Sequence, residues 1–236
     1  MAATELATKT WKFQPYDQNS IRKIRNILAQ ELDEILKTKG VAQIDGMNDD
    51  LVNELYQEAK KFPKRVGRYR EDSYYQEIFS FLPNSQISDS IYIPPKTRPV
   101  NLLRKIKRRF SYTAEIVAEA LTSLYEEVGK PEDLFLLRYR KGPNLYPTVN
   151  KRRRRKIILG AHTDHNYFML AAKSSHKGLE GYVQEQWISL QPEEGNFLIM
   201  PCTRLETISD EKIKALTHRV MTPQPENSIR YALMYY

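Results

Sequence analysis

The second half of the chain consists of short strand-like segments, and this feature limits the possible folds more than any other. From Leu134 to the C-terminus, short apolar runs alternate with turn signals. The expected strands are Leu134–Arg140, Lys156–Ala161, Phe168–Ala172, Gly181–Gln184, Trp187–Leu190, Phe197–Met200, Ala215–Met221 and Ile229–Tyr236. A series of this kind is typical of a β-sandwich or a jelly roll. We therefore expect residues 134–236 to form a barrel-like β core.

The first half is expected to be helical. Apolar residues recur at helical spacing over 19–39 and again over 101–129, and a further helix follows the capping residue Asn48. Between the last two helices, periodicity fades over 63–100 while prolines and aromatic residues accumulate. This long irregular stretch is either a cover for an active site or an aromatic layer between helices and barrel. We expect one domain, with a helical N-terminal region (residues 1–133) that includes the candidate lid 63–100, and a β core 134–236.

Composition gives information on the cellular location of the protein. Of its 236 residues, 41% are hydrophobic, which supports a packed core, and 28% are charged. The absence of a long apolar run argues against a membrane span. The N-terminus lacks a secretory signal, and the lone Cys202 leaves no internal disulfide, as is usual in a reducing compartment. These features predict a cytoplasmic location.

A candidate metal site follows the second expected strand. His162 and Asp164 are two residues apart, so in extended chain both side chains project to the same face. His218 lies in another strand-like run and could complete a set of two histidines and one carboxylate. Such a set suits non-haem Fe(II), because three ligands on one face leave the other positions open. Arg230, in the last strand, could hold a carboxylate through two parallel hydrogen bonds.

The spacing of these residues resembles that of the iron(II)/2-oxoglutarate-dependent dioxygenases, most closely the isopenicillin N synthase-like group. The resemblance is specific from about Leu134 to the C-terminus. Gln186–Leu190 resembles the tryptophan-bearing strand of the group, Glu194–Ile199 its P-G-x-hydrophobic strand, and Thr217–Val220 its H-R-V motif. The resemblance implies an α+β, mainly β fold, in which a double-stranded β-helix (jelly-roll) core carries N-terminal and bracing helices.

The resemblance also implies a cofactor set and a reaction. In the family, residues matching His162, Asp164 and His218 bind Fe(II), and the residue matching Arg230 binds the distal carboxylate of the cosubstrate 2-oxoglutarate. Oxidative decarboxylation of 2-oxoglutarate to succinate and CO2 with O2 then generates the oxidant. We expect an oxygenase that hydroxylates, desaturates or cyclises at a C–H bond of a small molecule.

Two departures from the family pattern affect cosubstrate binding. The family's R-x-S is Arg230-Tyr231-Ala232 here, so a hydroxyl is missing. The family's L-R-x-N-x-Y-P corresponds to 137–143, with Arg140 in place of asparagine and Gly142 in place of tyrosine. Alternation places Arg138 and Arg140 on one face of the strand. If that face lines the barrel, both arginines are candidates for cosubstrate binding; in the opposite phase they face solvent.

The distribution of charge favours a small anionic substrate, one that carries a carboxylate. The formal net charge is +8, and the basic run 151–156 could steer anions to the barrel mouth or could be a solvated hairpin tip. Arg65, Arg68 and Arg70 lie in the candidate lid.

Two alternative functions remain open. One is a nucleic-acid or protein demethylase on the same fold, and the other is a barrel that binds without catalysis. Nucleic-acid demethylases of this superfamily usually carry a second arginine six residues after the first. Tyr236 occupies that position here, and the basic run has no interleaved aromatic residues, so nucleic acid is not the expected partner.

Overall fold

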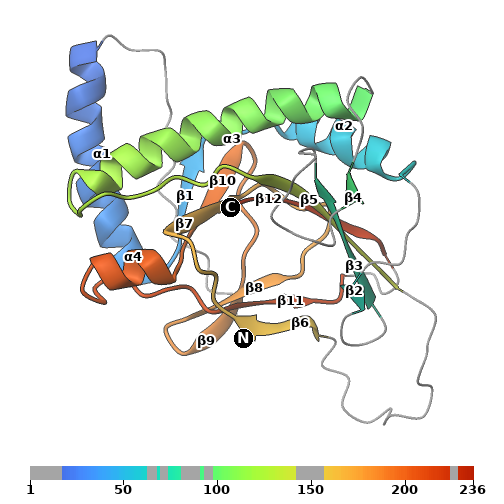
Figure 1. Ribbon diagram of the computed structural model, residues 1–236. Coiled ribbons are helices and arrows are strands. Elements are labelled where there is room, and N and C mark those ends of the chain that lie inside the picture. Colours follow the sequence, from blue (N-terminus) through green and yellow to red (C-terminus); the bar gives the residue numbers. More distant parts are fainter. Residues whose placement is uncertain are drawn as a thin grey trace.

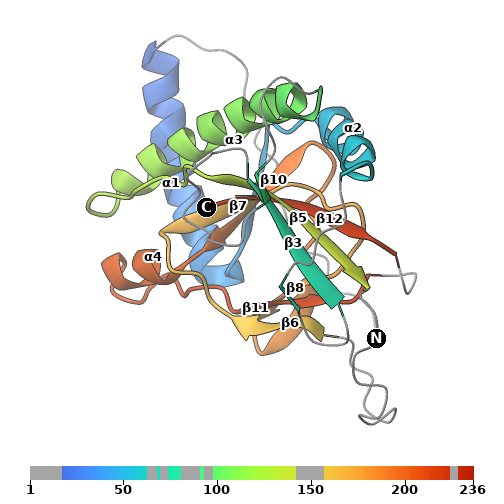
Figure 2. The same ribbon diagram turned by 45° about the vertical axis from the view of Figure 1, so that its right-hand side comes forward.

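The computed structural model describes residues 18–62, 68–69, 74–80, 91–92, 98–141, 157–223 and 228–236. Two β-sheets lie one above the other, and helices cover the outer face of the larger sheet (Figure 1). Figure 2 shows the smaller sheet on the opposite side of the larger sheet from the helices α2 and α3. The space between the two sheets is the interior of the barrel.

The larger sheet has the order β1-β10-β7-β12-β5-β3-β2, with β4 beside β3. Its strands are β1 (Ala42–Asp45), β2 (Arg68–Tyr69), β3 (Tyr74–Ser80), β4 (Ile91–Tyr92), β5 (Leu134–Lys141), β7 (Phe168–Ala171), β10 (Asn196–Pro201) and β12 (Arg230–Tyr235). The smaller sheet has the order β6-β11-β8-β9. Its strands are β6 (Ile157–His162), β8 (Leu179–Val183), β9 (Gln186–Ser189) and β11 (His218–Met221).

Three long helices form the outer layer, and a short one lies at the barrel mouth. They are α1 (Gln18–Lys39), α2 (Asp49–Ala59), α3 (Arg98–Thr122) and the short α4 (Thr203–Ile208). Helix α1 ends at Gly40, which has a φ of +70° and donates its N–H to Leu36 O at 3.0 Å. The side chain of Asn48 caps α2 by accepting the N–H of Leu51 at 3.0 Å.

Both faces of the larger sheet are buried, which gives the molecule two hydrophobic cores. Leu136 on β5 packs in the core under the helices, together with Phe110 of α3. Phe135, Leu137 and Tyr139 point the other way, into the core between the sheets. Because successive residues of a strand project to opposite faces, one strand serves both cores. This is why β5 shows no alternation of apolar and polar residues.

The expected architecture is confirmed. The structure contains an antiparallel double-stranded β-helix core with few helices, and the eight expected core strands are present within a few residues of their predicted bounds. The expected third helix begins earlier, at Arg98, and ends earlier, at Thr122. Among the described residues, no helix has the length and apolar character needed to cross a membrane.

The expectation of an irregular stretch over 63–100 is corrected. Part of that stretch is β3, which pairs with β5 along much of its length and so belongs to the sheet. Helix α4 was not predicted at all. The run 151–156 and the residues Arg65 and Arg70 lie outside the described residues, as does the side chain of Arg68.

Candidate metal centre

His162 and His218 face each other across the smaller sheet. His162 ends β6 and His218 begins β11, and the antiparallel register places the two residues directly opposite. Their ring centroids are 4.3 Å apart. Asp164 follows β6 by two residues, and its main-chain oxygen accepts the N–H of Thr203 at 3.0 Å. One ligand atom from each of these three residues can lie within 4.8 Å of the others.

Hydrogen bonds orient both imidazole rings for metal binding. Nδ1 of His162 lies 2.9 Å from Gly160 O, and Nδ1 of His218 lies 3.1 Å from Leu216 O. A carbonyl oxygen can only accept, so Nδ1 carries the proton in each ring and Nε2 of the neutral form has a free lone pair. Burial lowers the pKa of His218, against the opposing effect of the Asp164 charge, and so favours the neutral form that a metal requires.

The carboxylate of Asp164 has an oxygen that no described residue satisfies. Oδ2 is buried without a hydrogen-bond partner, although it lies 3.4 Å from Nε2 of His218. A buried carboxylate oxygen without a partner is costly unless a cation or a donor occupies the adjacent space. The donor set therefore fits a divalent metal, and two imidazoles with one carboxylate are the ligand types of non-haem Fe(II).

Arg230 lies inside the barrel at the start of β12. It is opposite Tyr139 of β5, and its guanidinium carbon is 5.4 Å from the centroid of the Tyr139 ring. The side chain is buried, and Nε donates to His176 O at 3.1 Å. Within the described part of the chain, the terminal nitrogens have no acceptor assigned to them. Burial lowers the pKa of Arg230 because it destabilises the charged guanidinium. A bound carboxylate would stabilise the charged form again.

Gly178 makes the room that Arg230 needs. A Cβ at this position would lie 3.3 Å from Cδ and Nε of Arg230 and 2.8 Å from Met221 O. The second distance is too short for any side chain, so this close approach requires glycine.

Arg138 and Arg140 do not line the barrel interior. The alternative in which their face of β5 lines the barrel is therefore wrong. Nε of Arg138 donates to Glu77 Oε2 at 2.5 Å, and Nε of Arg140 donates to the same oxygen at 3.1 Å. Arg138 also donates to the main-chain oxygens of Ala59 and Phe62 at the end of α2. Both arginines therefore lie on the helix-facing side of the sheet, with Leu136. The solvent alternative is also wrong for Arg138, which is only 2% exposed.

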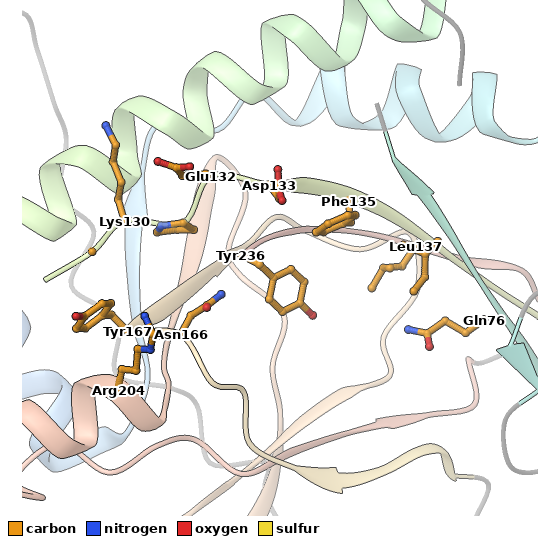
Figure 3. A pocket seen from close by; sticks show the side chains of 13 residues that line it. Gln76, Lys130, Glu132, Asp133, Phe135, Leu137, Asn166, Tyr167, Arg204 and Tyr236 are labelled. Atoms are coloured by element: carbon orange, nitrogen blue, oxygen red, sulfur yellow. The ribbon is translucent and has the colours of Figure 1, made fainter. Parts of the chain in front are cut away.

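A cavity of about 440 Å³ lies at the barrel mouth, next to the loop that follows Asp164 (Figure 3). Asn166, two residues after Asp164, lies on its wall, and Tyr236 projects into it. Burial raises the pKa of Tyr236 well above its ordinary value, and the charge of nearby Asp164 adds to the shift. The phenol therefore stays protonated and can donate a hydrogen bond.

Sequence reasoning did not select Asn166, Arg204, Gln76 or Tyr236 as site residues, although the structure brings all four to this cavity. The sequence offered a signal for Asn166 alone, because it lies two residues after the H-x-D motif. Gln76 lies on β3 and Arg204 on α4, which are two elements that were not predicted.

Comparison with known proteins agrees with the geometry. A model of the 2OG-Fe(II) oxygenase superfamily matches residues 131–236. The structure of a full-length Neurospora crassa protein in complex with alpha-KG is similar at a TM-score of 0.65 and 16% identity, covering 91% of this chain and 80% of that one. No curated protein matches the chain significantly.

Two further solved structures share the fold over almost the whole chain. AtDAO1 (dioxygenase for auxin oxidation 1) from Arabidopsis thaliana, with bound 2-oxoglutarate, has a TM-score of 0.64 and 14% identity, covering 97% of this chain and 91% of that one. JOX2 in complex with 2OG, Fe and JA has a TM-score of 0.56 and 15% identity, with coverages of 97% and 75%.

Over residues 131–236 the chain is similar to the 2OG-Fe(II) oxygenase superfamily. This match and the grouping of His162, Asp164 and His218 indicate a dioxygenase that uses Fe(II), 2-oxoglutarate and O2, as the sequence predicted. The comparisons do not single out the isopenicillin N synthase-like group.

Proposed function

We propose that the protein oxidises a C–H bond of a small molecule, with Fe(II) held by His162, Asp164 and His218. The observation that carries this assignment is the partnerless buried Oδ2 of Asp164 beside two imidazoles whose Nε2 atoms are free to coordinate. For hydroxylation, substrate, 2-oxoglutarate and O2 give the alcohol, succinate and CO2. Bound Fe(II) would supply the activation of O2, with 2-oxoglutarate as the source of two electrons.

The protein's own residues bind and orient the reactants. Arg230 would hold the distal carboxylate of 2-oxoglutarate through its terminal N–H groups, which have no other acceptor among the described residues. Tyr139, which lies beside Arg230 in the core between the sheets, would keep bulk water away from that ion pair. The imidazole hydrogen bonds to Gly160 and Leu216 hold the two rings in their coordinating orientation.

We further propose that the substrate is a small anion that bears a carboxylate. The cavity has the size of a small-molecule site. Its wall carries Lys130, Glu132, Asp133 and Arg204, and Arg204 comes from helix α4. A formal net charge of +8 would favour the approach of anions. The structural relatives include proteins whose names or complexes refer to small molecules such as auxin and JA. A cytoplasmic location belongs to the same proposal, in keeping with the single free Cys202.

The proposed function is tested by measuring whether the protein binds 2-oxoglutarate and converts it slowly to succinate without a substrate. The purified protein with Fe(II) is expected to bind 2-oxoglutarate, seen as metal-to-ligand charge-transfer absorption under anaerobic conditions, and to form succinate slowly in air. Asp164→Ala should abolish both, because the loss of one of three protein ligands leaves the metal poorly held.

Glu119→Ala is the matched control, since it removes an exposed carboxylate from α3 on the far side of the sheet. Circular dichroism should show both variants folded. If the unsubstituted protein shows no charge-transfer absorption and forms no succinate at millimolar 2-oxoglutarate, the proposed function is refuted. Full activity of Asp164→Ala would refute the ligand assignment.

A further inference from the structure

The cavity at the barrel mouth has a polar side at the loop that follows Asp164 and an apolar side along the larger sheet. Asn166 lies two residues after Asp164 in the chain, and the charge of Asp164 acts on the phenol of Tyr236. Phe135 and Leu137 of β5 line the apolar side. A ligand in this cavity would therefore place one end near the metal residues and its carbon skeleton along β5.

Arg204 is held at the polar side by main-chain and aromatic contacts. Its N–H donates to Asn166 O at 3.1 Å, which ties the start of α4 to the loop that carries Asp164. Its guanidinium carbon lies 5.7 Å from the centroid of the Tyr167 ring. This stacking limits the conformations of a long side chain, so less entropy is lost when it binds a ligand.

Arg204 differs from the other charged residues around the cavity. Lys130 has the carboxylate of Glu115 at 3.8 Å, and in Figure 3 Glu132 and Asp133 lie on the side next to α3, above Tyr236. Arg204 approaches from the opposite side, next to Asn166. Among the described residues, no carboxylate forms an ion pair with Arg204. Its planar guanidinium is thus free to donate two parallel hydrogen bonds to a carboxylate.

We propose that Arg204, with the side-chain amide of Asn166, binds the carboxylate of the substrate and so sets both the specificity of the enzyme and the position of the reacting carbon. This inference rests on the proposed function. Fixing one end of the substrate at α4 limits which carbon along β5 comes next to the metal, and such positioning gives an oxygenase its regioselectivity. Arg204 acts by binding and not as a proton donor.

The experiment uses benzoate and benzamide as probes, because they have similar shape and differ in charge. The protein is loaded with saturating 2-oxoglutarate and with Zn(II), which does not support turnover, so that Arg230 is already occupied. Ligand-observed NMR then gives both dissociation constants. Benzoate is expected to bind at least about tenfold more tightly than benzamide, which corresponds to about 1.4 kcal/mol. Arg204→Gln should reduce this preference to less than about twofold, and Arg204→Lys should retain part of it.

Arg104→Gln serves as the control, because it removes one positive charge from the exposed side of α3, away from the cavity. It should leave the preference for benzoate unchanged, which separates a local contact from the effect of net charge. Equal binding of the two probes by the unsubstituted protein, or an unchanged preference in Arg204→Gln, would overturn the inference.

The two proposals can fail separately. Substrate-free succinate formation and the 2-oxoglutarate charge-transfer absorption of the unsubstituted protein test the proposed function alone. If both are absent, the proposed function is wrong. If both are present and the unsubstituted protein does not distinguish the probes, only the role of Arg204 is wrong.

Discussion

Burial and partners separate the three arginines that the sequence marked as cosubstrate ligands. Arg138 and Arg140 share the Glu77 carboxylate on the helix side of the sheet, so their charges are already compensated. Arg230 lies on the barrel side, and the structure assigns no carboxylate within reach of its guanidinium among the described residues. Of the three, only Arg230 has both the location and the free donors that an anionic cosubstrate needs.

Replacing Arg230 should therefore weaken 2-oxoglutarate binding. Arg230→Ala leaves a buried carboxylate without its charge-assisted partner, at a cost of about 2–5 kcal/mol, so the dissociation constant should rise by well over tenfold. Arg230→Lys keeps the charge without the planar fork and should have an intermediate effect. Titration of the charge-transfer absorption measures both. An unchanged dissociation constant in Arg230→Ala would assign the distal carboxylate to another residue.

The sequence predicted that His162, Asp164 and His218 come together, but it did not predict the direction of the arginines. One property of strands explains both results. A spacing of two fixes that His162 and Asp164 share a face, whichever face it is. For Arg138 the prediction depended on which face of β5 lines the barrel, and both faces of this strand are buried. Without an exposed side, the hydrophobic pattern contains no information about phase.

Among the elements, β3 joins the helical layer to the barrel. Its Glu77 accepts hydrogen bonds from Arg138 and Arg140, and Arg138 in turn donates to the end of α2 through Ala59 O and Phe62 O. This network connects β3, β5 and α2. The segment around β3 was expected to be irregular because its aromatic and polar residues show no clear period. Its strand form depends on pairing with β5, a contact distant in sequence.

Removing the Glu77 charge should destabilise the fold and leave cosubstrate binding intact. Glu77 is 0% exposed and Arg138 is 2% exposed, so Glu77→Gln leaves a buried guanidinium poorly compensated, at a cost of about 3–5 kcal/mol in the free energy of unfolding. Urea denaturation measures this loss. Because the network lies on the helix side of the sheet, the 2-oxoglutarate dissociation constant should not change.

Glu211→Gln is the comparison for this prediction. Glu211 pairs with Lys214 at the surface, and their side chains are 75% and 63% exposed, so this substitution should change the free energy of unfolding little. If Glu77→Gln has normal stability but binds 2-oxoglutarate poorly, the prediction is wrong, and Arg138 and Arg140 are again candidates for cosubstrate binding.

Helix α4 shows the same limit of prediction from sequence. It is short, and its N-cap, Cys202, makes no side-chain capping hydrogen bond, so neither periodicity nor a cap signal indicated it. Main-chain hydrogen bonds from Cys202, Thr203 and Arg204 to the loop 164–167 hold its start in place. Tertiary contacts thus determine this helix, and with it the position of Arg204.

On the scale of the whole molecule, the larger sheet separates a helical layer from the layer that holds the candidate metal centre. Phe110 of α3 packs against Phe197 and Tyr235 of the sheet, with ring centroids 4.8 and 5.4 Å apart. The metal residues and Arg230 lie on the other side, and they come from β6, β11 and β12 and from the loop after β6. The site therefore forms only when both sheets are assembled, and its ligands should stabilise the whole fold.

Thermal unfolding tests this coupling. A ligand that binds only the folded state stabilises it by about 2.7 kcal/mol at a concentration 100-fold above its dissociation constant. For a chain of this length each kcal/mol raises Tm by about 2–4 °C, so 2-oxoglutarate added anaerobically to the Fe(II) form should raise Tm by about 5–11 °C. Arg230→Ala should keep the increase caused by the metal and lose most of that caused by 2-oxoglutarate at the same concentration, whereas Asp164→Ala should lose both. If 2-oxoglutarate stabilises Asp164→Ala as strongly as the unsubstituted protein, the cosubstrate binds away from the metal residues and the proposed site is wrong.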